Sequence, residues 1–173
     1  ASKVEAEASK VEAEASKVEA EAEAKASLER VKTRDRRYTK LQLAADAAME
    51  QGYFEQAVAT LTEVLALFED EPREEDVAYL AMTRMSRSLA LVKLGRAEEA
   101  MQDADEVVRI EPTWVRGYLC RAGAYQVMTR YDLALEQFSL AVRLDPANQE
   151  LIEGKRQLEQ IQEENRAMTE TLE

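Results

Sequence analysis

The residue types that most often perform catalysis are scarce in this chain. Its 173 residues include no histidine and one cysteine, Cys120, so zinc sites, cysteine–histidine nucleophiles and disulfide scaffolds are excluded or nearly so. Asp103 and Asp105 stand two positions apart on a predicted helix, where their carboxylates point in different directions and are interpreted as solvated surface. The sequence also lacks a phosphate-binding loop. We therefore expect no enzyme, no cofactor, no metal and no small-molecule substrate.

Charged side chains offer a second kind of chemistry. The net charge of −12 argues against a duplex nucleic acid as partner. Cations nevertheless gather over residues 28–40, and the candidate basic docking patch is Arg30, Lys32, Arg34, Arg36 and Arg37. The favoured interpretation is a solvated helix face. The alternative is a docking patch for an acidic surface.

A repeated register must position these side chains. Ala100 and Ala134 are 34 residues apart, as are Pro112 and Pro146. A fixed period of this size marks a repeat array, whose units bury their apolar faces by stacking. Such stacks present long surfaces that usually bind other proteins.

Local signals predict that each repeat is a helical hairpin. Gly52 and Gly95 follow helical runs, where a residue with positive φ ends a helix at little cost. Pro112 and Pro146 prevent continuation of the second helix of their repeats.

The pattern resembles the tetratricopeptide repeat family. The third repeat carries the matching residues Tyr118, Ala122, Tyr125, Ala134, Phe138 and Pro146. The resemblance implies an all-α fold, a right-handed superhelix of three tetratricopeptide helical hairpins at residues 38–146, with a capping helix and a long amino-terminal helical arm. The three repeats are expected at about 38–69, 81–112 and 115–146. In the second repeat, Arg84 and Arg87 stand where large apolar residues are usual.

The spacing between the first two repeats is larger than the period. Ala57 and Ala100 are 43 residues apart, and the excess lies around residues 69–76. This segment is too polar for a core, so we expect it to lengthen the helices on both sides of a turn.

The resemblance also implies a possible ligand. Chaperone-binding members of this family hold a terminal carboxylate in a clamp of lysine, asparagine and arginine side chains. The corresponding positions here are Gln42, Asp46, Ser86, Arg116 and Cys120. Only Arg116 keeps a positive charge, so we expect no standard clamp and negligible binding of chaperone tails.

The first helices of the repeats instead predict an apolar groove. Its candidate residues are Met49, Met85, Leu89, Val92, Arg116, Leu119 and Val127, with Met82 as an addition. A methionine-rich groove suits an amphipathic or extended partner segment. Alternatively these side chains fill the core between helices, which is favoured for Leu89 and Val92. The main hypothesis is a non-enzymatic scaffold or adaptor; the alternative is a co-chaperone-type module that binds a chaperone tail through a degenerate clamp.

The amino-terminal segment, residues 1–32, repeats the heptad ASKVEAE three times through Glu21. Its seam is Ala1, Val4, Ala8, Val11, Ala15 and Val18. We expect a long helix that is broken near a basic junction at 33–37. A semi-rigid spacer is favoured over a coiled coil, because alanine buries little area.

The carboxy-terminal segment, residues 147–173, is expected to be a capping helix that begins at Asn148. Leu151, Ile152 and Leu158 should cover the last repeat. A heptad seam of Leu158, Ile161, Asn165, Met168 and Leu172 is the weaker alternative. Either helical end could join a larger assembly. With no membrane span and no signal peptide in the sequence, we expect a cytoplasmic protein that makes no membrane contact, either a fragment or a processed product.

Overall fold

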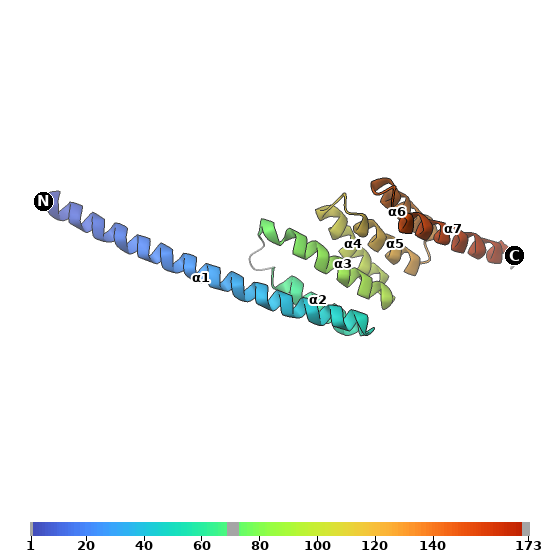
Figure 1. The fold of residues 1–173 in the computed structure, drawn as a ribbon, viewed down its shortest axis with the longest axis horizontal. Coiled ribbons are helices and arrows are strands. Elements are labelled where there is room, and N and C mark those ends of the chain that lie inside the picture. The colour runs from blue at the N-terminus through green and yellow to red at the C-terminus, as the bar shows by residue number, and fades with distance from the viewer. Residues whose placement is uncertain (1, 69–72, 171–173) are drawn as a thin grey trace. The chain divides into compact units, whose positions relative to one another are not determined.

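The computed structural model describes residues 2–68 and 73–170, and within them every regular element is helical (Figure 1). The elements are α1 (Ser2–Glu50), α2 (Phe54–Ala66), the 3-10 turn η1 (Glu74–Asp76), α3 (Val77–Lys93), α4 (Ala97–Ile110), α5 (Val115–Val127), α6 (Tyr131–Leu144) and α7 (Gln149–Glu170). Two compact units, residues 1–40 and 41–173, divide the chain. The predicted all-α fold of sequential hairpins is confirmed.

Helix α1 is continuous over 49 residues, so the break expected near 33–37 is absent. Glycine and proline do not occur before Gly52. The hydroxyls of Thr33 and Thr39 donate to the carbonyl oxygens four residues earlier, each at 2.9 Å. These threonines therefore bond within the helix and do not interrupt it.

Each hairpin turn uses one residue in the left-handed region. Gly52 has φ 76°, Gly95 φ 72° and Thr129 φ 57°. After Gly95, the N–H of Arg96 donates to the carbonyl of Leu91 at 2.9 Å, which closes the helix end in a Schellman motif. The predicted helix ends at the two glycines are confirmed.

Alanines bring the helices together along the repeat domain. Ala48, Ala57 and Ala90 form one buried cluster, which joins α1, α2 and α3. The equivalent clusters further along are Leu91–Ala100–Ala124 and Ala122–Ala134–Leu158. The first two clusters join consecutive hairpins, and the third joins the α5–α6 hairpin to α7, so neighbouring units bury one another's small apolar faces.

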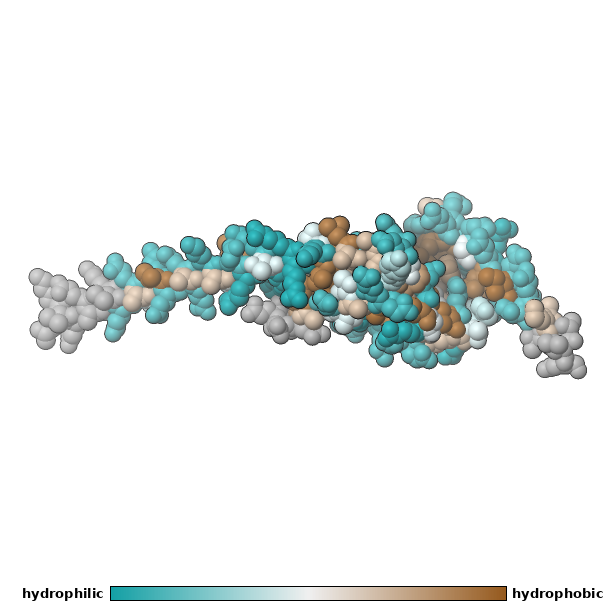
Figure 2. Space-filling view, turned by 90° about the horizontal axis from the view of Figure 1, so that it is seen from below, coloured by the Kyte–Doolittle hydropathy of each residue, from teal (hydrophilic) through white to brown (hydrophobic). Residues whose placement is uncertain are grey.

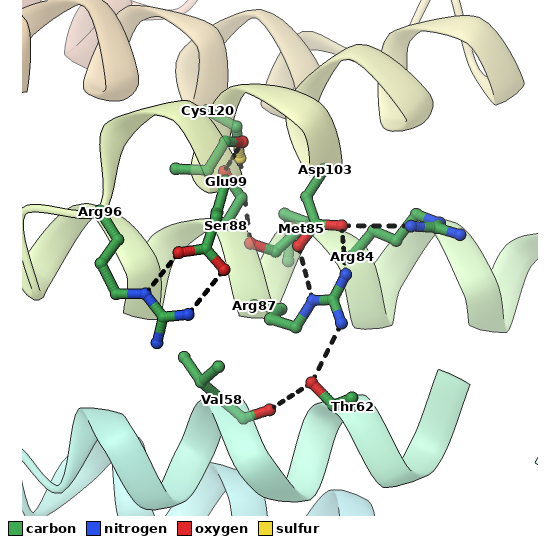
Figure 3. Close-up of polar contacts among 11 residues, drawn as sticks. Val58, Thr62, Arg84, Met85, Arg87, Ser88, Arg96, Glu99, Asp103 and Cys120 are labelled. Carbon is green, nitrogen blue, oxygen red and sulfur yellow. Dashed lines mark hydrogen bonds and ion pairs between the residues drawn. The ribbon is translucent and has the colours of Figure 1, made fainter. Parts of the chain in front are cut away.

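The second hairpin, α3–α4, contains an ion-pair network that the sequence interpretation did not anticipate (Figure 3). Asp103 was expected to be solvated, but it is 1% exposed. The Arg87 guanidinium donates to both of its carboxylate oxygens, at 2.7 and 2.8 Å, and Arg84 donates at 3.2 Å. Arg87 also donates to Thr62 of α2 at 3.0 Å. The arginines at usually apolar positions are therefore paired, while Asp105 is exposed as predicted.

Helix α7 covers the last repeat and begins as predicted. The Asn148 side-chain oxygen accepts from the N–H groups of Glu150 and Leu151, at 3.1 and 3.4 Å, and so caps the helix. Leu151 and Leu158 are buried, but Ile152 is 40% exposed, so the expectation that it covers the repeat was wrong.

The distal part of α7 is exposed. Ile161 and Met168 remain open to solvent, and Leu172 lies outside the described residues.

The polar segment before α3 lengthens only one of its neighbours. Helix α3 has 17 residues, whereas α5 in the next repeat has 13. Helices α2 and α4 have 13 and 14 residues, so no extension precedes the turn. The backbone N–H of Arg73 donates to the Asp76 carboxylate at 3.1 Å, and this hydrogen bond fixes the start of the extension.

Among the described helices, none is long and apolar enough to cross a bilayer.

Candidate partner-binding groove

An open pocket of about 470 Å³ lies within the repeat domain, and we call it the trough. Its apolar wall consists of Met85 and Leu89 from α3 and Leu119 from α5. Met85 and Leu89 are four residues apart and therefore share a face of α3. Arg116 and Leu119 share a face of α5 in the same way. The trough thus combines apolar side chains from two repeats with one cation.

Two connections between helices also line the trough. Thr113 and Trp114 come from the α4–α5 turn, where the Tyr118 hydroxyl donates to the carbonyl of Pro112 at 2.8 Å. Asp145 and Asn148 come from the α6–α7 turn. Both turns follow from the proline register, because each proline stops a helix at the same edge of the stack.

Sequence reasoning missed the lining residues that the two connections, the buried part of α5 and the start of α7 contribute. The additional lining residues are Thr113, Trp114, Val115, Cys120, Asp145, Asn148, Glu150 and Leu151. The 34-residue register could have indicated the turns, since it places residues after Pro112 and Pro146 at corresponding points. The sequence carries no comparable signal that α7 also lines the pocket.

Cys120 forms part of the wall but is chemically quiet. Its side chain is 2% exposed, and its thiol lies 4.0 Å from the carbonyl oxygen of Met85. Burial raises the pKa of the Cys120 thiol to about 11. The thiol is therefore protonated at neutral pH and is a poor nucleophile.

The positions that correspond to a carboxylate clamp retain little positive charge. The Gln42 amide donates to a carboxylate oxygen of Asp46 at 2.9 Å, so these two side chains bind each other. Cys120 is neutral, and Ser86 is partly buried. Arg116 is exposed and remains the one cation in this set.

The structure separates the predicted groove residues into three groups. Met85, Leu89, Arg116 and Leu119 line the trough. Met49 and Val92 are partly buried and pack against the core clusters of the first and second hairpins.

The third group lies elsewhere on the surface. Val127, which is 36% exposed, does not line the trough. Met82 borders a separate pocket with Trp114 and Glu111. The sequence interpretation favoured a core position for Leu89, but this side chain is 42% exposed and is therefore not part of the core.

The candidate basic patch does not share one environment. Arg30, Lys32, Arg36 and Arg37 are exposed. The Arg34 side chain is 14% exposed, with its guanidinium 3.8 Å from Asp35. Docking of an acidic partner here remains a prediction that involves the four exposed cations.

The amino-terminal seam is thin where its side chains are described. Ala15 and Val18 are exposed, and Figure 2 shows a narrow pale-to-brown line among hydrophilic atoms in this part of the chain.

Across residues 2–68 and 73–170, no group of three or more histidine, cysteine, aspartate or glutamate side chains could hold a metal ion.

The chain is similar in sequence to part of an Hsp70-Hsp90 organizing protein and in structure to solved TPR domains. No protein-family model matches the chain. The Hsp70-Hsp90 organizing protein 2 of Arabidopsis thaliana is 40% identical over 83 residues, which are 47% of this chain. The chain spans 14% of the length of that relative.

Two solved structures share the fold and contain bound peptides. The second TPR domain of human RPAP3, in complex with the HSP70 peptide SGPTIEEVD, superposes with a TM-score of 0.60 at 16% identity, covering 73% of this chain and 98% of that one. The first TPR of Spaghetti (RPAP3), bound to the HSP90 peptide SRMEEVD, gives 0.59 at 18% identity, covering 73% and 93%. The chain therefore has a TPR-like all-α fold and is similar in sequence, over 83 residues, to a segment of an Hsp70-Hsp90 organizing protein.

Proposed function

We propose that the repeat domain is a co-chaperone-type module that binds a segment of another protein in the trough. One observation carries the proposal: Met85, Leu89, Leu119 and Arg116, from two repeats, line a single open pocket. Apolar side chains exposed in a concave surface are unfavourable in water and usually mark an interface. A partner segment that buries them would gain free energy roughly in proportion to the apolar area covered.

The first candidate partner is the carboxy-terminal tail of a heat-shock chaperone. The comparisons support this candidate, since similar domains were solved with such peptides. They favour it over a scaffold with an unspecified partner, although the sequence alone placed it second. Arg116 would supply the one charge-assisted contact to a carboxylate, so we expect weaker binding than a complete clamp gives.

The second candidate is an apolar segment that needs no free terminus. Its support is the composition of the wall, because Met85, Leu89 and Leu119 offer no hydrogen bonds. Methionine adapts to irregular apolar guests, which makes such a wall tolerant of sequence.

Isothermal titration with SRMEEVD separates these candidates. The peptide is titrated once with a free carboxy-terminus and once as the amide. Binding that depends on the free acid supports the tail, and equal binding of both forms supports the apolar segment. Binding of neither form overturns the assignment to chaperone tails.

A double variant tests the trough itself. Met85→Glu with Leu119→Glu should abolish peptide binding and leave the helical circular dichroism signal unchanged, because both side chains are only partly buried. Ile161→Glu, on an exposed part of α7, is the matched control and should bind normally. If the double variant unfolds, the two residues belong to the core and the trough is not the binding surface.

A further inference from the structure

The trough has charges of opposite sign on different helices. Arg116 lies in the first turn of α5, whereas Asp145 follows α6 and Glu150 lies in the first turn of α7. All three residues line the same pocket around Met85 and Leu119.

These charges lack ionic partners within the described part of the chain. Of the ion pairs among residues 2–68 and 73–170, none involves Arg116, Asp145 or Glu150. Asp145 accepts a 3.0 Å hydrogen bond from the Asn148 amide, which holds the carboxylate at the α6–α7 turn. By contrast, Arg121, five residues after Arg116 on α5, is paired with Asp105 at 2.7 Å.

We propose that the trough selects a bipolar segment: an apolar residue flanked by a basic residue on one side and an acidic residue on the other. The apolar side chain would lie against Met85, Leu89 and Leu119. The acidic residue would pair with Arg116, and the basic residue with Glu150 and Asp145. This inference rests on the proposed binding of a partner segment in the trough and specifies its chemistry.

Charge complementarity makes the selection directional. A segment with acidic residues alone would satisfy Arg116 but would place negative charge near Glu150 and Asp145. Like charges brought together at an interface disfavour the wrong partner and set the register of the right one. The peptide SRMEEVD has the required order, since an arginine and a methionine precede its acidic residues, whereas SGPTIEEVD contains no basic residue.

A charge-reversal experiment tests the inference. Fluorescence anisotropy compares SRMEEVD with SAMEEVD, in which alanine replaces the arginine. On the unmodified chain, SRMEEVD should bind about three- to fivefold more tightly, the usual contribution of a partly exposed ion pair. Glu150→Lys should remove or reverse this difference, and Glu150→Gln should remove part of it.

Controls distinguish the local contact from the change in net charge. Glu163→Lys makes the same charge change on an exposed part of α7 and should preserve the preference for SRMEEVD. Circular dichroism checks that Glu150→Lys keeps the α7 cap. Equal binding of the two peptides to the unmodified chain overturns the bipolar inference and leaves the proposed function standing. Binding of neither peptide overturns the proposed chaperone-tail function and this inference with it.

Discussion

The second and third hairpins follow the same 34-residue register but fill their interiors differently. In the third, α5–α6, Ala122 and Ala134 pack with Leu158 of α7, and aromatic rings surround them. Gln137 of the third hairpin corresponds to Asp103 in the second, α3–α4. Two arginines surround Asp103. The hairpin geometry therefore depends on the small and turn-forming residues, whereas the space beside them admits either ion pairs or rings.

The difference matches what each hairpin contacts. Helix α3 lies between α2 and α5, and Arg87 reaches from Asp103 to Thr62 of α2. The ion network thus connects the second hairpin to the first. The third hairpin is covered by α7, which supplies apolar side chains. Burying charges requires partners for all of them, so the second hairpin should be the more sensitive to loss of one polar side chain.

The largest expected effect is on the carboxylate at the centre of that network. Asp103→Asn should lower the free energy of unfolding by about 2–4 kcal/mol, because two partly buried guanidinium groups lose their counter-charge. The loss should be smaller than for a fully buried pair, since Arg84 and Arg87 retain some exposure. Urea denaturation followed by circular dichroism measures the loss.

Asp105→Asn is the matched control on the same helix. Its carboxylate is half exposed and accepts one bond from Arg121, so the cost should stay below about 1 kcal/mol. Equal costs for the two variants would show that the network does not stabilise the second hairpin.

The next effect should be shared by the two hairpins. Ala134→Leu and Ala100→Leu should each cost about 1–3 kcal/mol, because both alanines are fully buried where helices cross. Thermal and chemical denaturation of the two single variants provide the measurement. An unchanged midpoint for either one would mean that its helix crossing can relax around a larger side chain.

Two glycines of α5 should respond with opposite signs. A Cβ at Gly117 would lie 2.8 Å from Val108 Cγ2, whereas one at Gly123 would lie 3.6 Å from Val92 Cγ2. Gly117→Ala should therefore destabilise the fold by about 1–2 kcal/mol, since the overlap outweighs the gain in helix propensity. Gly123→Ala should instead stabilise it by up to about 1 kcal/mol. Stabilisation by both changes would contradict the close approach of α5 to α4.

The fold could be predicted largely from the register. Glycine, alanine and proline act on the backbone locally, so Gly95 and Pro112 predict helix ends wherever the neighbouring helices lie. The polar interior of the second hairpin could not be assigned in this way. Arg87 and Asp103 are 16 residues apart, and only the packing of α3 on α4 shows that they meet.

The trough was predicted in part for the same reason. Met85 and Leu119 occupy equivalent positions in successive first helices, so the repeat places them together. Met49 precedes Gly52 by three residues, as Val92 precedes Gly95, and both side chains pack against core clusters instead of lining the trough. Glu150 enters the site from the first turn of α7, which lies outside the repeats and carries no periodic signal, whereas Asp145 lies in the α6–α7 turn that the register indicates.

The smallest expected effect concerns the one turn residue that differs between the hairpins. Thr129 has φ 57° where the second hairpin has Gly95 at 72°. A branched residue is strained in this region, and a Cβ at Gly95 would meet nothing within 4 Å, so any difference is conformational and not steric. Thr129→Gly should stabilise the fold by about 0.5–1 kcal/mol, since release of strain exceeds the added entropy of the unfolded chain. Gly95→Thr should cost a similar amount, about 0.5–1 kcal/mol, because the lower entropy of the unfolded chain offsets part of the strain in the left-handed region. A higher urea midpoint for Thr129→Gly and a lower one for Gly95→Thr would show that the two turns are equivalent. Loss of stability in both variants would show that Thr129 makes a compensating contact and that the turns differ.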